Sequence, residues 1–434
     1  MNSGFYIIMA AQFFSSLADN ALLVAAIALL MQSNQPSWLT PFLKFFFVLS
    51  YVLLAPYVGA FADRLPKGQV MFLSNAVKIA GCALMLLQFN PLASYALVGL
   101  GAAAYSPAKY GILTEYLPPT KLVLANGWIE GLTVASIILG TVLGGALINR
   151  TVATHLLAFD MPLIDTGIDT PAEAALVVII AVYALAALFN LYVPRTSAPL
   201  KHLHASPLAT LKDFIRCAAR LWFDKLGQVS LAVTTLFWGV GATLQFIVIE
   251  WSRAALGFDL SKAALLQGVV AFGVAAGAVA ASVRVPLHYS VKVLPLGIAM
   301  GIVVMMMVAV HSVWVAVPLM VMVGGLAGFF VVPMNALLQH RGHNLMGAGR
   351  SIAVQNFNEN LSVVVMLLLY SQLLRAGLSI YVVIVIFGLF VSCSMTLVLL
   401  WYLRNRRLYR RKIDRLLSFA RSEDYHHHHR FRSQ

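Results

Sequence analysis

Several ionisable residues lie inside long apolar runs of this 434-residue sequence. An ionisable group within a membrane span is costly, and it usually serves to bind or move a substrate or an ion. Five positions stand out: Asp19, Lys109, Glu130, Glu250 and Glu359. For each, the alternative is an ion pair or polar clamp between helices. We favour a cavity role for Asp19 and Glu359. Both interpretations stay open for Lys109 and Glu130. The structural alternative is stronger for Glu250, because it lies near the outer membrane face.

Amide side chains lie within about one helical turn of three of these charges: Asn20, Asn126, Gln355 and Asn356. A cavity that combines carboxylates, a cation and amides, beside apolar stretches such as 42–57, suits a substrate with a charged head and an apolar tail. Because amides often bind sugars, a sugar remains an alternative substrate. Lys78 is a lesser case, because a lysine can snorkel to the interface or form a structural pair.

The composition indicates which elements must hold these residues. Sixty per cent of the residues are apolar, 11% are charged and the mean hydropathy is +0.84, whereas a soluble domain carries about a quarter charged residues. These values argue against a soluble enzyme, a disordered protein and a secreted disulfide scaffold. A membrane β-barrel would need short segments of alternating hydropathy, and the sequence shows none. The sequence predicts an all-α polytopic membrane protein with twelve spans of about 20 residues, near 5–31, 40–62, 70–89, 92–114, 122–148, 172–193, 229–255, 262–283, 291–310, 313–338, 347–374 and 379–403.

The positive charges predict the orientation of these spans. If the N-terminus is cytoplasmic, most of the 30 Lys and Arg residues fall in inner loops and in the C-terminal tail, as the positive-inside rule requires. Both termini are then cytoplasmic, and the net charge of +14 reflects topology and anionic lipid rather than nucleic acid. The run His426–His429 is predicted to belong to a disordered terminal tract and is assigned neither a metal nor a function.

The chain is predicted to divide into four parts: a six-helix bundle over 1–193, a cytoplasmic linker over 194–227, a second six-helix bundle over 228–404 and a basic tail over 405–434. Within the linker, Ser206 and Pro207 form a helix-start signal, and the apolar residues after them recur at helical spacing. This predicts a helix lying on the cytoplasmic membrane surface. Residues 125–133 align with 354–362, which pairs Glu130 with Glu359, and the region around Pro107 and Lys109 aligns with Pro333 and Asn335. These matches indicate two pseudo-symmetric halves.

A loop between the second and third spans carries a further motif. Its sequence GAFADRLPKG supplies Gly59, Asp63, Arg64, Lys67 and Gly68, and it resembles the signature loop of the major facilitator superfamily. Asp63 can accept hydrogen bonds from the electropositive start of the eleventh span, near Arg350. Such a contact would hold the cytoplasmic side closed, so we expect these residues to gate it.

Longer stretches resemble one family within that superfamily. The segments AQFFSSLADNALL, YVLLAPYVGAFADRLPKG, AAAYSPAKYGILTE, KLVLANGWIEG, FFVVPMNALLQHRG and GAGRSIAVQNFNEN are similar to the bacterial lysophospholipid transporter (LplT) family. The likeness covers nearly all of 5–404. The family's acidic first-span motif falls on Asp19 and Asn20, and its polar span-eleven motif on Gln355, Asn356 and Glu359. One departure is Gln245, where family members carry Arg, together with the additional Glu250.

The resemblance implies a major facilitator fold in the inner membrane and flipping of lysophospholipids, chiefly lysophosphatidylethanolamine, from the outer to the inner leaflet for re-acylation. It implies a monomer without cofactor, with an acyltransferase as possible partner. We expect alternating access about a midplane site, with Asp19 attracting the ethanolamine ammonium and Lys109 contacting the phosphate.

Two other functions compete with this expectation. A multidrug or amphiphile exporter of the same fold would be proton-coupled through Asp19 or Glu359. A membrane-embedded lipid acyltransferase or hydrolase needs a positioned acid, base or nucleophile, and the sequence contains no motif for one.

Overall fold

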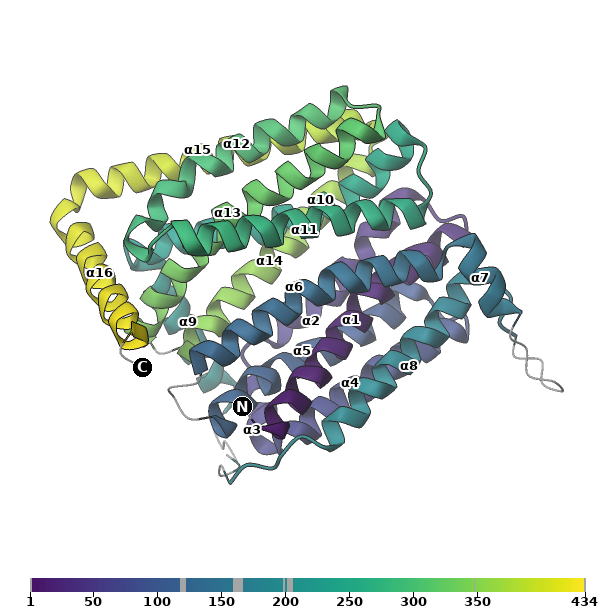
Figure 1. Cartoon of the computed structure of the whole chain (residues 1–434), viewed down its shortest axis with the longest axis horizontal. Coiled ribbons are helices and arrows are strands. Elements are labelled where there is room, and N and C mark those ends of the chain that lie inside the picture. The colour runs from purple at the N-terminus through teal and green to yellow at the C-terminus, as the bar shows by residue number, and fades with distance from the viewer. Residues whose placement is uncertain are drawn as a thin grey trace. The chain divides into compact units, whose positions relative to one another are not determined.

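The computed structural model of the chain describes residues 2–117, 122–158, 167–197, 200, 206–346 and 348–432. It describes their side chains except at 59, 60, 63, 114, 122–124, 126, 127, 130, 343, 348, 349 and 422–432. Every regular element in these ranges is a helix (Figure 1). The chain forms two compact units. Unit 1 comprises Met1–Pro207, Val248–Gly268 and Leu367–Ala376, and unit 2 comprises Leu208–Ile247, Val269–Met366 and Gly377–Gln434.

Unit 1 is built mainly from the first half of the chain. Its helices are α1 (Ser3–Gln32), η1 (Ser37–Leu39), α2 (Thr40–Leu54), α3 (Val58–Arg64), α4 (Lys67–Leu86), α5 (Pro91–Tyr116), α6 (Leu122–Leu147), α7 (Arg150–Leu157) and α8 (Pro171–Leu191). Helix α1 packs against α6 and α8, and α4 packs against α5 and α8. A Cβ atom added at Gly144 of α6 would lie 2.9 Å from the carbonyl oxygen of Ala21. Glycine therefore permits the close approach of α6 to α1.

Unit 2 contains most of the second half. Its helices are α9 (Pro207–Phe223), α10 (Gly227–Leu256), α11 (Leu260–Arg284), η3 (Leu287–Val293), α12 (Leu294–Met305), η4 (Met306–Ala309), α13 (Val313–Met346), α14 (Ala348–Arg375), α15 (Ile380–Leu408) and α16 (Arg410–Arg432). Helix α12 packs against α13 and α15. Apart from α9, whose first residue Pro207 is the last of its segment of unit 1, three helices contribute to both units. Residues 248–256 of α10, 260–268 of α11 and 367–375 of α14 belong to unit 1.

The predicted all-α polytopic fold is confirmed. Ten of the described helical segments are long and apolar enough to cross a membrane, or up to eleven if α6 and α7, which are bent by 68°, count as one span. Helices α5 and α6 have 26 residues each, and they account for the difference from the twelve predicted spans. Both α5 and α13 continue through an internal proline, Pro107 and Pro333, at the positions that the repeat aligns.

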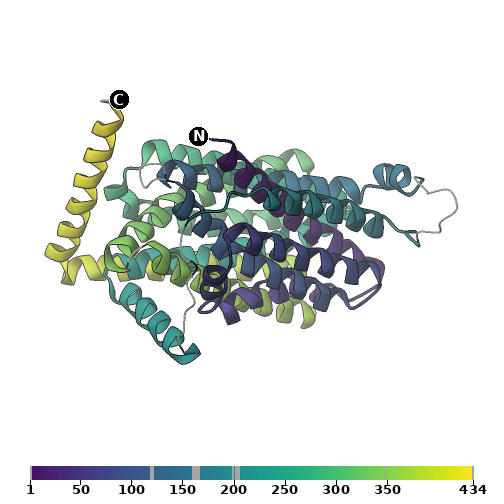
Figure 2. The same cartoon turned by 90° about the horizontal axis from the view of Figure 1, so that it is seen from below.

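Two local predictions are wrong. The second span was expected to continue over 40–62, but α2 ends at Leu54 and α3 begins at Val58. Pro56, whose nitrogen cannot donate a helical hydrogen bond, lies in this break. The terminal tract was expected to be disordered, but α16 continues through 426–429 and extends from the end of α15 (Figure 2). Ile413 and Ala420, seven residues apart and thus on one helical face, are buried, and α16 packs against η3.

The amphipathic helix predicted in the linker is present as α9. Cys217 and Leu221 are buried in a cluster with Leu231 of α10, Leu338 of α13 and Val354 of α14, so α9 is anchored on unit 2. The neighbouring apolar stripe remains open: Leu208 and Ile215 are 60% and 56% exposed. This stripe is available for the predicted contact with the membrane surface.

Candidate functional site

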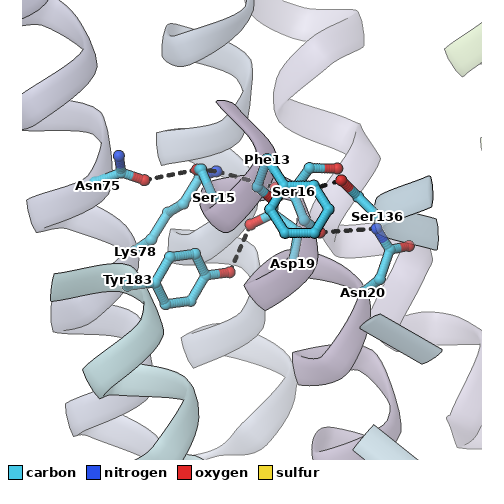
Figure 3. Close-up of polar contacts among 9 residues, drawn as sticks. All are labelled: Phe13, Ser15, Ser16, Asp19, Asn20, Asn75, Lys78, Ser136 and Tyr183. Carbon is cyan, nitrogen blue, oxygen red and sulfur yellow. Dashed lines mark hydrogen bonds and ion pairs between the residues drawn. The ribbon is translucent and has the colours of Figure 1, made fainter. Parts of the chain in front are cut away.

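Asp19 lies in a polar cluster within unit 1 (Figure 3). Its Oδ2 atom lies 3.0 Å from the Lys78 ammonium, and its Oδ1 accepts a 2.5 Å hydrogen bond from the Tyr183 hydroxyl. Lys78 also donates to the Ser15 hydroxyl at 3.0 Å, and that hydroxyl donates to the Asn75 side-chain oxygen at 2.7 Å. The cluster thus joins α1, α4 and α8 through one carboxylate and one ammonium.

Lys78 is buried beside two aromatic rings. Its ammonium lies 5.0 Å from the ring centroid of Tyr105 and 5.6 Å from that of Tyr183, distances at which a cation is attracted to a π-face. The Lys78 side chain is 2% exposed, whereas that of Asp19 is 22% exposed. The carboxylate is therefore the more accessible member of the pair.

The sequence alone ranked Lys78 below the other membrane charges and overlooked its aromatic partners. Lys78 is 59 residues from Asp19 in the chain, and Tyr183 is 164 residues away. The available signal was chemical: a carboxylate and an ammonium within apolar runs of the same half of the chain each need a partner of opposite charge.

The contacts described above do not include the other predicted site residues of unit 1. The Asn20 amide donates to the backbone oxygen of Ser16 at 2.8 Å, within α1. Lys109 is half-buried on α5, with its ammonium 4.6 Å from the ring centroid of Tyr110. Asn126 and Glu130 lie on α6, but their side chains are outside the described part of the structure.

Unit 2 carries a second polar cluster on α13 and α14. The Gln355 amide nitrogen donates to the Asn335 side-chain oxygen at 2.5 Å and to a Glu359 carboxylate oxygen at 2.8 Å. Gln355 and Glu359 are buried. In the repeat these three residues align with Lys109, Asn126 and Glu130, so the aligned positions of unit 2 form one connected network.

The two remaining substrate-site candidates are also in unit 2. Gln245 is half-buried on α10. Asn356 is half-buried on α14, where its backbone oxygen accepts a 2.8 Å hydrogen bond from the Asn360 amide. Neither residue is part of the Gln355 hydrogen bonds described above.

The loop motif borders a cavity of about 450 Å³ in unit 1, which Lys67, Gly68, Glu115 and Arg195 help to line. Lys67 is buried, 3.2 Å from a Glu115 carboxylate oxygen, and donates to the backbone oxygen of Ala62 at 2.9 Å. A Cβ atom at Gly68 would lie 3.1 Å from Cβ of Val193, which explains the small residue there.

The gating contact predicted for the motif stays a prediction. Arg64 is exposed at the end of α3, and the burial and contacts of Gly59 and of the Asp63 side chain are outside the described part of the structure. Arg350 lies 3.7 Å from the Asp213 carboxylate of α9, and both side chains are largely exposed. Because the pair is exposed, it adds little stability, and each residue can readily take another partner.

The chemistry available in unit 1 is charge recognition. The Asp19 carboxylate can hold an ammonium, and Lys78 and Lys109 can hold an anion. In unit 2, Glu359 supplies a second carboxylate that an amide donor orients. The groups of unit 1 thus offer both a negative and a positive charge to a zwitterion.

Comparison with known proteins identifies the family of the chain. The sequence pattern of the Major Facilitator Superfamily matches residues 8–364. The chain is 42% identical to the lysophospholipid transporter LplT of Yersinia enterocolitica serotype O:8 / biotype 1B, over 87% of this chain and 89% of the relative. It is 43% identical to the LplT protein of Yersinia pestis (strain Pestoides F), over 85% of this chain and 86% of the relative.

Solved structures agree on the fold. A bacterial homologue of the human lysosomal transporter Spinster, in an inward-facing and unoccupied conformation, matches 93% of this chain and 99% of its own with a TM-score of 0.65 at 16% identity. A point mutant of the nucleoside transporter NupG matches 91% of this chain and 100% of its own with a TM-score of 0.67 at 10% identity. The chain therefore belongs to the major facilitator superfamily and, within it, to the LplT family.

Proposed function

We propose that this chain is a secondary transporter that flips lysophospholipids, chiefly lysophosphatidylethanolamine, from the outer to the inner leaflet of the bacterial inner membrane. The observation that carries this proposal is the 42% identity to a lysophospholipid transporter over 87% of the chain. The protein acts as a monomer with both termini cytoplasmic, and the lipid that it delivers is re-acylated by a membrane-associated acyltransferase.

The Asp19 cluster supports recognition of the ethanolamine head. The lipid ammonium carries the same charge as Lys78, so it can replace Lys78 at Asp19 without leaving the carboxylate unpaired. Lys78, held near the rings of Tyr105 and Tyr183, then faces the lipid phosphate together with Lys109. Because one charge is exchanged for another, this step avoids the large cost of an isolated buried ion.

The remaining candidates act on the second half of the site and on the gate. Glu130 and Glu359 shape the cavity or form state-dependent pairs, and Asn20, Asn126, Gln245, Gln355 and Asn356 supply hydrogen bonds to the head group. The motif residues Gly59, Asp63, Arg64 and Gly68, with Arg350, open and close the cytoplasmic side as the two halves rock about the midplane.

Uptake of labelled lysophosphatidylethanolamine by spheroplasts that lack their own transporter tests the proposal. We expect lipid to reach the inner leaflet with the intact chain, and uptake to fall to the empty-vector level with Asp19→Ala. Mass spectrometry should recover the lipid chemically unchanged. No uptake by a well-inserted, folded chain would overturn the proposal. Proton-dependent efflux of amphiphilic drugs by that chain would support the exporter alternative instead.

A further inference from the structure

A second cavity lies at the opposite end of α1 from the loop motif, and all its lining residues belong to unit 1. Its volume is about 370 Å³, within the range of small-molecule sites. The apolar part of its lining comes from Ile27, Met31 and Ile249. The polar part comes from Asn34, Gln35, Ser37, Thr40, Glu250 and Arg253. With the N-terminus cytoplasmic, this cavity opens toward the outer side of the membrane.

The cavity presents one negative and one positive charge side by side. Glu250 and Arg253 are one helical turn apart on α10, with 3.5 Å between a carboxylate oxygen and a guanidinium nitrogen. This is longer than the 3.0 Å of the Asp19–Lys78 pair, and the side chains are 26% and 43% exposed. A partly exposed pair of this kind contributes little stability, so both charges can turn to a ligand at small cost.

The part of the lining that contains Ser37 and Thr40 is held in place. The Ser371 hydroxyl of α14 donates to the backbone oxygen of Trp38 in η1, at 2.5 Å. The Arg375 guanidinium lies 5.0 Å from the Trp38 ring centroid, at cation–π distance. These contacts fix η1 and with it Ser37 and Thr40, whose hydroxyl groups can bond phosphate oxygens.

We infer that this cavity is an outer recognition site for the zwitterionic phosphoethanolamine head of a lysophospholipid. Glu250 binds the ammonium, Arg253 binds the phosphate with help from Ser37 and Thr40, and the acyl chain leaves along the apolar side of the cavity. The inference rests on the proposed function and deepens it, because it places a selection of the head group at the outer side, before the lipid reaches Asp19. Glu250 is the residue that sets zwitterionic heads apart from anionic ones.

Transport kinetics with two lipids test the inference. Glu250→Gln, Arg253→Gln and wild type are compared in proteoliposomes with lysophosphatidylethanolamine and with lysophosphatidylglycerol, which has a phosphate but no ammonium. We expect Glu250→Gln to raise KM for lysophosphatidylethanolamine about tenfold, the size of a lost charge-assisted hydrogen bond, and to leave KM for lysophosphatidylglycerol within about twofold. Arg253→Gln should raise KM for both lipids.

A matched control removes a carboxylate from the same side of the molecule but outside the cavity. Glu173→Gln, at the start of α8, should behave as wild type. Glu250→Asp retains the charge and should recover most of the discrimination, which keeps the test decisive if Glu250→Gln folds poorly. Equal effects of Glu250→Gln on the two lipids, or no effect on either, would overturn the inference. Failure of wild type to transport either lipid would instead overturn the proposed function.

Discussion

The pairing of Asp19 with Lys78 gives Asp19 a structural task in addition to the functional one that we propose for it. A buried ion pair repays its desolvation only while both partners are present. The two additional hydrogen bonds, from Tyr183 to Asp19 and from Lys78 to Ser15, satisfy the groups further. Loss of transport in an Asp19 variant could therefore reflect instability, and the two effects must be separated.

A pair of variants separates them. Lys78→Met leaves the Asp19 carboxylate unpaired, and we expect the protein to lose about 3–5 kcal/mol of stability, seen as a lower midpoint in thermal unfolding of the detergent-purified protein. The double variant Asp19→Asn/Lys78→Met removes both charges and should recover most of that midpoint while transport stays absent. Wild-type transport by the double variant would show that the pair is structural only.

The spans and the amphipathic helix could be predicted from the sequence, but the contacts between residues far apart in the chain could not. Bilayer thickness sets the length of the apolar runs, so the spans could be located without knowing their packing. The partners of Asp19 depend on which helices pack together, which hydropathy leaves open. Likewise α9 was recognised from its spacing, but the face that it buries, through Cys217 and Leu221, is chosen by the cavity that α10, α13 and α14 leave for it.

At the scale of helices, an ion pair in unit 2 connects the start of α10 with the end of α13. Asp224 accepts two hydrogen bonds from the Arg341 guanidinium, at 2.9 and 2.7 Å, and one from the Gly227 backbone N–H at 2.8 Å. Both side chains are buried. Burial alone would raise the Asp224 pKa, but the hydrogen bonds and charge of Arg341 outweigh it and hold the pKa below its usual value.

The depressed pKa predicts how the stability depends on pH. A carboxyl whose pKa is lower in the folded state stabilises the protein above its unfolded pKa of about 3.9, and this contribution is lost as the pH falls through the folded value. Arg341→Met should therefore cost about 3–5 kcal/mol at pH 7, and the difference from wild type should shrink below about pH 4.

Thermal unfolding of the two purified proteins across a pH series measures that difference. Arg341→Lys is the control, because it keeps the charge but loses the two-pronged geometry, and it should fall between the other two at neutral pH. A difference between Arg341→Met and wild type that stays constant down to pH 3 would contradict the role assigned to Asp224.

For the whole molecule, the contacts inside unit 1 bear on alternating access. The end segments of α10, α11 and α14 pack with the first half of the chain, and the Ser261 hydroxyl of α11 donates to the Gly145 backbone oxygen of α6 at 2.8 Å. On the predicted topology this is the outer end of both helices. A transporter must break such contacts to admit a substrate from that side.

Gly145 offers a way to shift that equilibrium. A Cβ atom there would lie 2.7 Å from Cβ of Ala264 and 3.0 Å from the Ser261 backbone oxygen, so Gly145→Ala separates α6 from α11. Overpacking of this kind costs about 1–3 kcal/mol, enough to favour the outward-open state by about 5- to 150-fold. We expect faster labelling of a Thr40→Cys reporter in the outer cavity by an impermeant maleimide, together with slower transport.

The same helix supplies the control for this prediction. An added Cβ at Gly131 meets no atom within 4 Å, so Gly131→Ala makes the same chemical change in α6 without the wedge. Both variants are made with Cys393, the exposed cysteine of the chain, replaced by Ser, so that the reporter alone reacts. If Gly145→Ala and Gly131→Ala label and transport alike, the contact between α6 and α11 is not the one that opens. If only Gly145→Ala changes both rates, closure of this end limits the transport cycle.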